Sequence, residues 1–290
     1  VQALTNVTFS ADYTVELSDT GAVSLTDLSG IGGKAAGEVV VANAISGSGT
    51  ATEVSDAFVA PGTKVTLSAG STVTVTADEP MDAATGAAIA VVNNLTPTFA
   101  GGVTDAFAKL YDTSAPGITS DLGDILTADT DAAISVSDTS GSVPATALSA
   151  LQAATAGGTV TLSGAATPSA TVTVTGNFAE VTQAVVTDGV VALGADVSMS
   201  GDAGTDVAAN GLSAIMAKVG SVTVTDAINV TGNDAQVKSA LVDDQVSASL
   251  ATVEISGNTA AATITSLYGV STGAITATVT ETALADLYAM

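Results

Sequence analysis

The sequence contains no His, Cys, Trp or Arg, and its basic residues are five lysines, Lys34, Lys64, Lys109, Lys218 and Lys238. Without His, no side chain has an unperturbed pKa near neutrality. Without His and Cys, zinc, iron and copper sites lose their usual ligands, and no Ser-His-Asp or Cys-His nucleophile can be built. Without Arg, no bidentate fork for phosphate or carboxylate exists. We therefore expect a protein that is not an enzyme and has no organic cofactor.

Positive charge is also scarce, so that 29 acidic residues leave a net charge of −24. Nucleic acid is excluded as a partner, because binding it requires Lys and Arg against the phosphates. An anionic membrane surface is disfavoured for the same reason. No apolar run approaches the roughly 20 residues that span a bilayer, so no membrane span is predicted. Divalent cations are the natural counter-ions, and calcium, which takes oxygen ligands, is the candidate.

Aromatic residues make up 3% of the chain and charged residues 12%, whereas 47% of the residues are hydrophobic. Disordered chains combine low hydrophobicity with high charge, so this composition predicts a folded protein of one or two domains. The absence of Cys excludes disulfides, and because many exported bacterial proteins avoid Cys we expect an extracellular location. No basic n-region or long apolar run follows Val1, so a signal peptide is expected to be absent or already removed.

A strand motif of the form V-x-V-S/T-G/D recurs in the C-terminal part of the sequence. Three copies begin at Val172, Val197 and Val222, in steps of 25 residues. Helix-like stretches lie between such strands, at 145–155, 207–218, 234–242 (with Asp234 as the expected N-cap) and 283–290. The rhythm indicates parallel strands joined by crossovers and predicts a solenoid-like repeat domain over 116–290, with units of about 25 residues. The alternative is a β-sandwich of ordinary antiparallel strands.

The first part of the chain has a less regular pattern. Strands are expected at 7–17, 22–25, 38–41, 64–67, 72–76 and 87–92, separated by Gly- and Ser-rich turns such as 29–37 and 45–50. These signals predict a β-sandwich-like domain over 1–115. The segment 111–122 contains Pro, Gly and Ser and is the expected boundary. The predicted fold class is therefore mainly β, with a sandwich-like domain followed by a repeat domain of strands and short helices.

Acidic residues cluster at several points and are the candidate calcium ligands. One group lies within eleven residues near the expected boundary, and a second flanks a glycine after a strand. The candidates are Asp121, Asp124, Asp129, Asp131, Asp202 and Asp206. Neither these nor the clusters at 78–82 and 243–244 match the EF-hand loop or the G-G-x-G-x-D nonapeptide. The ordinary interpretation of each group is turn and cap chemistry, for which Asp is favoured.

The helix-strand modules at 212–228 (LSAIMAKVGSVTVTDAI) and 266–290 (SLYGVSTGAITATVTETALADLYAM) resemble repeat modules of large bacterial cell-surface proteins. Such modules occur in S-layer proteins and calcium-dependent adhesins. The resemblance extends from residue 134 onward. It implies export, repeated β-architecture, calcium binding and no catalysis.

These observations predict a non-enzymatic extracellular structural protein, which self-associates into a homopolymer or lattice such as a surface layer or filament. Two alternatives stay open. The first is a phage or virion structural protein, such as a fibre or capsid decoration, and the second is an adhesive, carbohydrate-binding module.

Strict alternation of apolar and polar residues marks the stretch from Val7 to Leu17, which is longer than the common strand of about five or six residues. One interpretation is the first strand of its own domain. The other is a strand donated to a neighbouring subunit, as in β-augmentation. At the other end of the chain, an uncapped solenoid would offer an open sheet edge that pairs with the next subunit.

Overall fold

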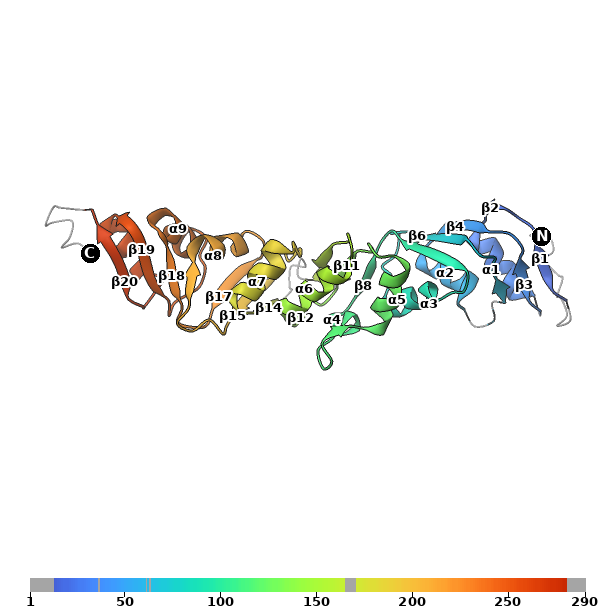
Figure 1. Ribbon diagram of the computed structural model, residues 1–290, viewed down its shortest axis with the longest axis horizontal. Coiled ribbons are helices and arrows are strands. Elements are labelled where there is room, and N and C mark those ends of the chain that lie inside the picture. Colours follow the sequence, from blue (N-terminus) through green and yellow to red (C-terminus); the bar gives the residue numbers. More distant parts are fainter. Residues whose placement is uncertain (1–12, 36, 61, 63, 165–170, 281–290) are drawn as a thin grey trace. The chain divides into compact units, whose positions relative to one another are not determined.

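The structure is a computed structural model, and it describes residues 13–35, 37–60, 62, 64–164 and 171–280 (Figure 1). It is mixed α/β, 33% helical and 31% strand, with several small parallel sheets. The prediction of a mainly β fold, as a sandwich followed by a solenoid, is therefore wrong. The chain divides into two compact units, residues 1–136 with 153–159 and residues 137–152 with 160–290. The division into domains 1–115 and 116–290 stays a prediction.

The first unit alternates short strands with helices. Its strands are β1 (Val15–Leu17), β2 (Gly21–Ala22), β3 (Val39–Val41), β4 (Ile45–Gly49), β5 (Val65–Thr66), β6 (Ser71–Val75), β7 (Leu95–Phe99), β8 (Val103–Asp105), β9 (Tyr111–Asp112), β10 (Gly117–Ile118) and β11 (Ile134–Val136). Its helices are α1 (Leu25–Lys34), α2 (Ala51–Phe58), α3 (Ala83–Ala90), α4 (Phe107–Leu110) and α5 (Ser120–Ala128). The order strand, strand, helix recurs, for example in β3, β4 and α2.

Two parallel sheets organise this unit, with the orders β1-β3-β5 and β2-β4-β6-β7. Val39 pairs with Val15 on one side and with Val65 on the other, and Ser46 pairs with Thr72. Paired strands are thus separated by one strand-strand-helix repeat, which supplies the long crossover that parallel strands need. β8 and β11 also pair in parallel, whereas β9 and β10 form an antiparallel hairpin.

The core of the first unit lies between the helices and the β2-β4-β6-β7 sheet. Figure 1 shows α1, α2 and α3 following one another along these strands, and neighbouring helices are in contact. Val54 of α2 and Ile89 of α3 are fully buried, and Val73 and Val75 of β6, a strand in contact with α2, are 2% exposed. Each such side chain contributes about 1.5–3 kcal/mol through burial. The apolar helix faces therefore explain why a mainly β sandwich does not form.

Glycine-rich segments that were expected as turns form regular elements instead. Residues 29–34 belong to α1, and β4 occupies most of 45–50. A Cβ at Gly47 would lie 2.8 Å from Cδ2 of Leu25, so glycine at this position lets α1 lie close against the strand. The expected strand at 87–92 is likewise wrong, because its first four residues are the end of α3. Glycine here is a packing residue, and for this reason its frequency does not predict turns.

The second unit also alternates short strands with helices. Its strands are β12 (Ser140–Pro144), β13 (Val160–Leu162), β14 (Thr171–Gly176), β15 (Asp196–Met199), β16 (Asp206–Ala208), β17 (Ser221–Val224), β18 (Asn229–Asn233), β19 (Thr252–Thr259) and β20 (Ile275–Val279). Its helical elements are α6 (Ala145–Ala154), which ends at the division between the units, α7 (Phe178–Val181), α8 (Ala209–Met216), α9 (Asp234–Lys238), α10 (Ala261–Tyr268) and the π-helical segments η2 (Thr182–Thr187) and η3 (Ser239–Asp243).

Two four-stranded parallel sheets form the second unit, with the orders β12-β14-β15-β17 and β16-β18-β19-β20. This pairing confirms one part of the sequence prediction, namely that the strands are parallel and joined by crossovers. Val197 pairs with Val222, as the 25-residue step predicts, but its other partner is Val174 rather than Val172. The inward-facing valines of these strands are almost fully buried, with Val174 at 0% and Val197 at 1% exposure.

The helices of the second unit agree in part with the sequence pattern. Helix α6 covers the stretch expected at 145–155, α8 lies inside 207–218, and α9 with η3 covers 234–243. The expected N-cap Asp234 is wrong, because it is the first helical residue and Asn233 is the cap. The side chain of Asn233 accepts a hydrogen bond from the Gln236 backbone N–H at 3.0 Å, and Gln236 Oε1 accepts one from the Asn233 backbone N–H. The stretch 283–290 lies outside the described residues.

Candidate functional site

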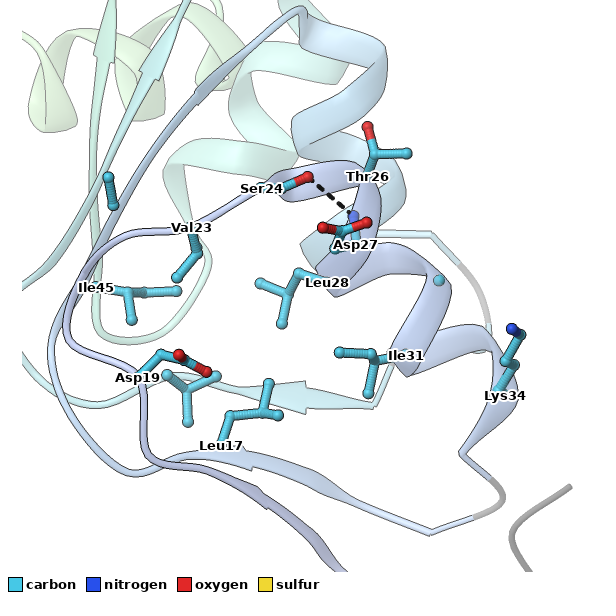
Figure 2. A pocket seen from close by; sticks show the side chains of 13 residues that line it. Leu17, Asp19, Val23, Ser24, Thr26, Asp27, Leu28, Ile31, Lys34 and Ile45 are labelled. Carbon is cyan, nitrogen blue, oxygen red and sulfur yellow. Dashed lines mark hydrogen bonds between the residues drawn. The ribbon is translucent and has the colours of Figure 1, made fainter. Parts of the chain in front are cut away.

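A groove opens between β1 and α1 in the first unit, with a volume of about 600 Å³. Figure 2 shows Leu17, Val23, Leu28, Ile31 and Ile45 around the hollow. The groove therefore has apolar walls, contributed by β1, α1, β4 and the connection from β2 to α1.

Local chemistry fixes the helix that forms one wall of this groove. The Ser24 hydroxyl is the N-cap of α1 and accepts a hydrogen bond from Asp27 N at 3.2 Å. Such a cap satisfies one of the free N–H groups of the first turn. Three charged side chains, Asp19, Asp27 and Lys34, line the groove together with the apolar residues (Figure 2). The site is thus an apolar hollow with charges of both signs beside it.

The strands beside the groove lie at the edges of their sheets. β1 pairs only with β3, and β2 only with β4, among the strands that the structure describes. Leu17 is half-buried, whereas its register partner Val41, one strand further in, is 2% exposed. Of the long strand expected at 7–17, the structure has β1 at Val15–Leu17, while residues 7–12 lie outside the described part. The alternative of a strand donated to a neighbour stays a prediction.

A second edge with half-exposed apolar side chains lies in the second unit, at β20. Ile275, Ala277 and Val279 are half-buried along this strand, although Val253, the partner of Ile275 on β19, is 1% exposed. Tyr268, at the end of the preceding helix α10, is 59% exposed. Unpaired strand edges and exposed apolar side chains are the features by which other chains associate with a sheet.

The acidic residues near the expected boundary have separate roles in the structure. Asp121 lies in the first turn of α5, where a carboxylate interacts favourably with the helix dipole. Asp124 is exposed on the same helix. Asp129 is the C-cap of α5, and its Oδ2 accepts a hydrogen bond from Phe99 N at 2.5 Å. Burial raises the pKa of Asp129, and the neighbouring Asp131 raises it further. Asp129 and Asp131 therefore influence each other, while Asp121 and Asp124 lie on the helix.

The second predicted group is divided between two environments. Asp202 is 9% exposed, and its Oδ2 accepts a hydrogen bond from Phe178 N at 2.7 Å. Asp206 is exposed at the start of β16 and accepts a hydrogen bond from the Asn229 side chain at 2.9 Å. Their carboxylates bind protein N–H groups of neighbouring strands and helices, which is the turn and cap role expected of Asp.

Sequence reasoning missed Asp226, which continues the role of Asp202 one repeat further on. Oδ2 of Asp226 accepts hydrogen bonds from Gly201 N at 2.5 Å and from Asp202 N at 3.0 Å. Each carboxylate thus binds the backbone of the preceding repeat, 24 residues earlier for both Phe178–Asp202 and Asp202–Asp226. The recurrence of Asp at this interval is the signal that would have identified it.

Within the described ranges, no three His, Cys, Asp or Glu side chains come together in a way that could hold a metal ion. Elsewhere, Asp243 forms an ion pair with Lys238 at 2.7 Å, and Asp82 caps α3 by accepting from Thr85 N at 2.7 Å. Calcium binding stays a prediction for the full chain.

In the part of the chain that the structure covers, no helix has the length and apolar character needed to cross a membrane. Comparison with known protein families, curated proteins and solved structures gives no match for this chain.

Proposed function

We propose that the chain is a non-enzymatic structural subunit, which associates with copies of itself into a repetitive extracellular assembly such as a surface layer or filament. The observation that carries this proposal is the presence, among the described strands, of two sheet edges with half-exposed apolar side chains, at β1 and at β20, with the exposed edge strand β2 next to β1 in the sequence. Such edges offer backbone N–H and C=O groups together with apolar area to another chain.

The chemistry of the chain supports the non-enzymatic part of the proposal. The side chains that usually transfer protons or attack substrates near neutral pH are absent from the sequence, since it has no His and no Cys. The groove beside α1 contains Ser24, Thr26, two aspartates and one lysine, and its walls are apolar. This arrangement suits the packing of another apolar surface better than it suits a reaction.

The extracellular part of the proposal rests on composition. The chain has no Cys, and its net charge of −24 suits an environment in which divalent cations are plentiful. Cations between acidic subunits would reduce the repulsion that opposes close packing. We therefore include divalent cations among the partners of the proposed assembly.

Sedimentation velocity over a range of protein concentrations, with electron microscopy of the same samples, tests the proposal. We expect larger species to grow with concentration and to appear as fibres or sheets. A series of salt concentrations, with and without Ca²⁺, separates charge repulsion from the lack of an interface, because screening removes only the former. A protein that stays monomeric at every concentration and salt condition would refute self-association.

A further inference from the structure

We propose that β20 of one copy docks at the β1–α1 groove of a second copy, where it extends the β2-β4-β6-β7 sheet as an additional parallel strand beside β2. This inference rests on the proposed self-association and names the two surfaces that make the contact. The occupant of the groove is thus a second copy of the chain itself.

The two surfaces belong to the same kind of repeat. In the first unit, β3, β4 and α2 follow one another, and β4 is in the same sheet as β2. In the second unit, β17, β18 and α9 follow in the same order, and β18 is in the same sheet as β20. β2 and β20 are therefore corresponding strands of their repeats. Among the strands that the structure describes, each lies at a sheet edge and pairs in parallel with its neighbour.

The interior of the first unit shows what normally covers the apolar wall of the groove. Ile31 and Ala57 both lie seven residues after the N-cap of their helices, which are Ser24 for α1 and Thr50 for α2. Ala57 is fully buried, because α2 lies between α1 and α3. Ile31 is half-exposed, since no described helix precedes α1. A further strand-helix repeat is thus the kind of structure that completes this wall.

Apolar side chains are left half-exposed beside both surfaces, at β1 in the wall of the groove and at β20. Leu17 and Ile275 are half-exposed, whereas their partners one strand further in, Val41 and Val253, are 2% and 1% exposed. Docking of β20 at the groove would cover Leu17 and Ile275, and pairing with β2 would satisfy the backbone groups of both edge strands. The gain from apolar area is proportional to the surface removed from water.

Charge also favours this contact. Two chains that each have a net charge of −24 repel one another, so a close contact is least costly where carboxylates are absent. No charged residue occurs from Ile255 to Thr280, the stretch that includes α10 and β20. The groove is lined by Lys34 together with Asp19 and Asp27, so a segment without carboxylates is the one that adds no repulsion there.

Cysteine cross-linking tests the contact directly, because the natural chain has no Cys and each introduced thiol is unique. One copy would have Ala22→Cys on β2, and a separately produced copy would have Thr276→Cys or Thr278→Cys on β20. Neighbouring strands lie about 4.8 Å apart, within the Cα separation of a disulfide. We expect the mixed copies to form a disulfide-linked dimer under mild oxidation. Thr74→Cys, exposed on the interior strand β6, replaces Ala22→Cys in the matched control.

A charge placed in the groove gives an independent measurement. Ile31→Glu would bury a carboxylate in the contact, so we expect association to weaken at least about tenfold in sedimentation equilibrium, equivalent to about 1.4 kcal/mol. Thr72→Glu makes the same charge change at an exposed position of β6 and should associate like the natural protein. Circular dichroism checks that both variants fold.

The outcomes separate this inference from the proposed function. A cross-link between β2 and β20 well above the control supports the contact. Assembly of the natural protein with no excess over the control overturns the contact, while self-association stands. Cross-linking that appears only after residues 1–12 are deleted also overturns it, because the groove of the full chain is then filled by its own N-terminal segment. Absence of any assembly refutes the proposed function itself.

Discussion

At the scale of residues, carboxylates connect one repeat to the next. Asp202 accepts a hydrogen bond from Phe178 N, and Asp226 accepts from Asp202 N, so a series of backbone donors is satisfied at an interval of 24 residues. Hydrogen bonds to charged acceptors are stronger than neutral ones. These contacts explain why Asp202 and Asp226 lie shortly after the ends of β15 and β17.

We expect Asp226→Ala to lower the free energy of unfolding by about 1.5–3 kcal/mol, because Gly201 N and Asp202 N both lose a charged acceptor. Urea unfolding followed by circular dichroism measures the loss. Asp124→Ala, at an exposed position on α5, is the control and should stay within about 0.5 kcal/mol of the natural protein. Equal effects of the two substitutions would contradict the proposed role of Asp226.

The pKa of Asp129 is raised by burial and by the nearby Asp131. A raised pKa means that the folded chain binds the proton more tightly than the unfolded chain, so stability from this group is greatest at low pH and is lost as pH rises through the folded pKa. We therefore expect Asp129→Asn to raise the melting temperature at neutral pH, with the difference shrinking towards pH 3.8, the ordinary pKa. Thermal melts across this range measure it.

Asp112 supplies a control of opposite sign. The backbone N–H groups of Ser114 and Ala115 lower the pKa of its carboxyl, so its contribution is present above the ordinary pKa and disappears as pH falls through the folded one. Asp112→Asn should thus lower the melting temperature slightly at neutral pH. If both variants shift the melting temperature in the same direction, local structural change rather than titration is responsible.

At the scale of elements, the sequence predicts strands and helices where its signals are local. The valine motif predicts the pairing of Val197 with Val222, and the apolar spacing predicts α6 and α8. Helix α2 was not predicted, although the capping box of Thr50 and Glu53 is its sequence signal. The role of the glycines depends on close contacts such as Leu25 against the Gly47 position, which only the folded chain brings together.

The capping box of α2 gives a prediction at this scale. Thr50 Oγ1 accepts from Glu53 N at 3.2 Å, and Glu53 Oε2 accepts from Thr50 N at 2.9 Å. Thr50→Ala should lower the free energy of unfolding by about 0.5–2 kcal/mol, since Glu53 N loses its Oγ1 acceptor while the backbone N–H of residue 50 keeps the Glu53 carboxylate. Chemical denaturation measures it, with Thr74→Ala on the exposed face of β6 as the control. A loss no larger than that of Thr74→Ala would show that packing alone holds α2.

At the scale of the whole molecule, amino-acid composition limits the possible chemistry, whereas the sequence pattern did not predict the fold class or the groove. The absence of His, Cys and Arg restricts the chemistry without any structural information. The groove beside α1 could not be predicted, because its walls come from Leu17, Leu28 and Ile45, which only the parallel pairing of β1 with β3 and of β2 with β4 brings together. The fold class was wrong because apolar helix faces in the first half are short and rich in Ala and Gly.

We expect removal of divalent cations to destabilise the assembly. Subunits with a net charge of −24 repel one another, and bridging cations relieve that repulsion. A chelator at moderate salt should therefore lower the melting temperature of the assembly or dissociate it, with light scattering as the second measurement. Monovalent salt at matched ionic strength is the control. An unchanged melting curve in chelator would remove calcium from the account.

The short sequence distance between paired strands has a consequence for how the chain folds. Val39 pairs with Val65, and Val253 pairs with Ile275, so strand partners are about one repeat apart in a chain of 290 residues. Such low contact order is typical of fast-folding proteins, because little loop entropy is lost before a contact forms. Each repeat can therefore acquire its partner as soon as the next one emerges from a ribosome or an export channel, and folding can proceed in the direction of synthesis.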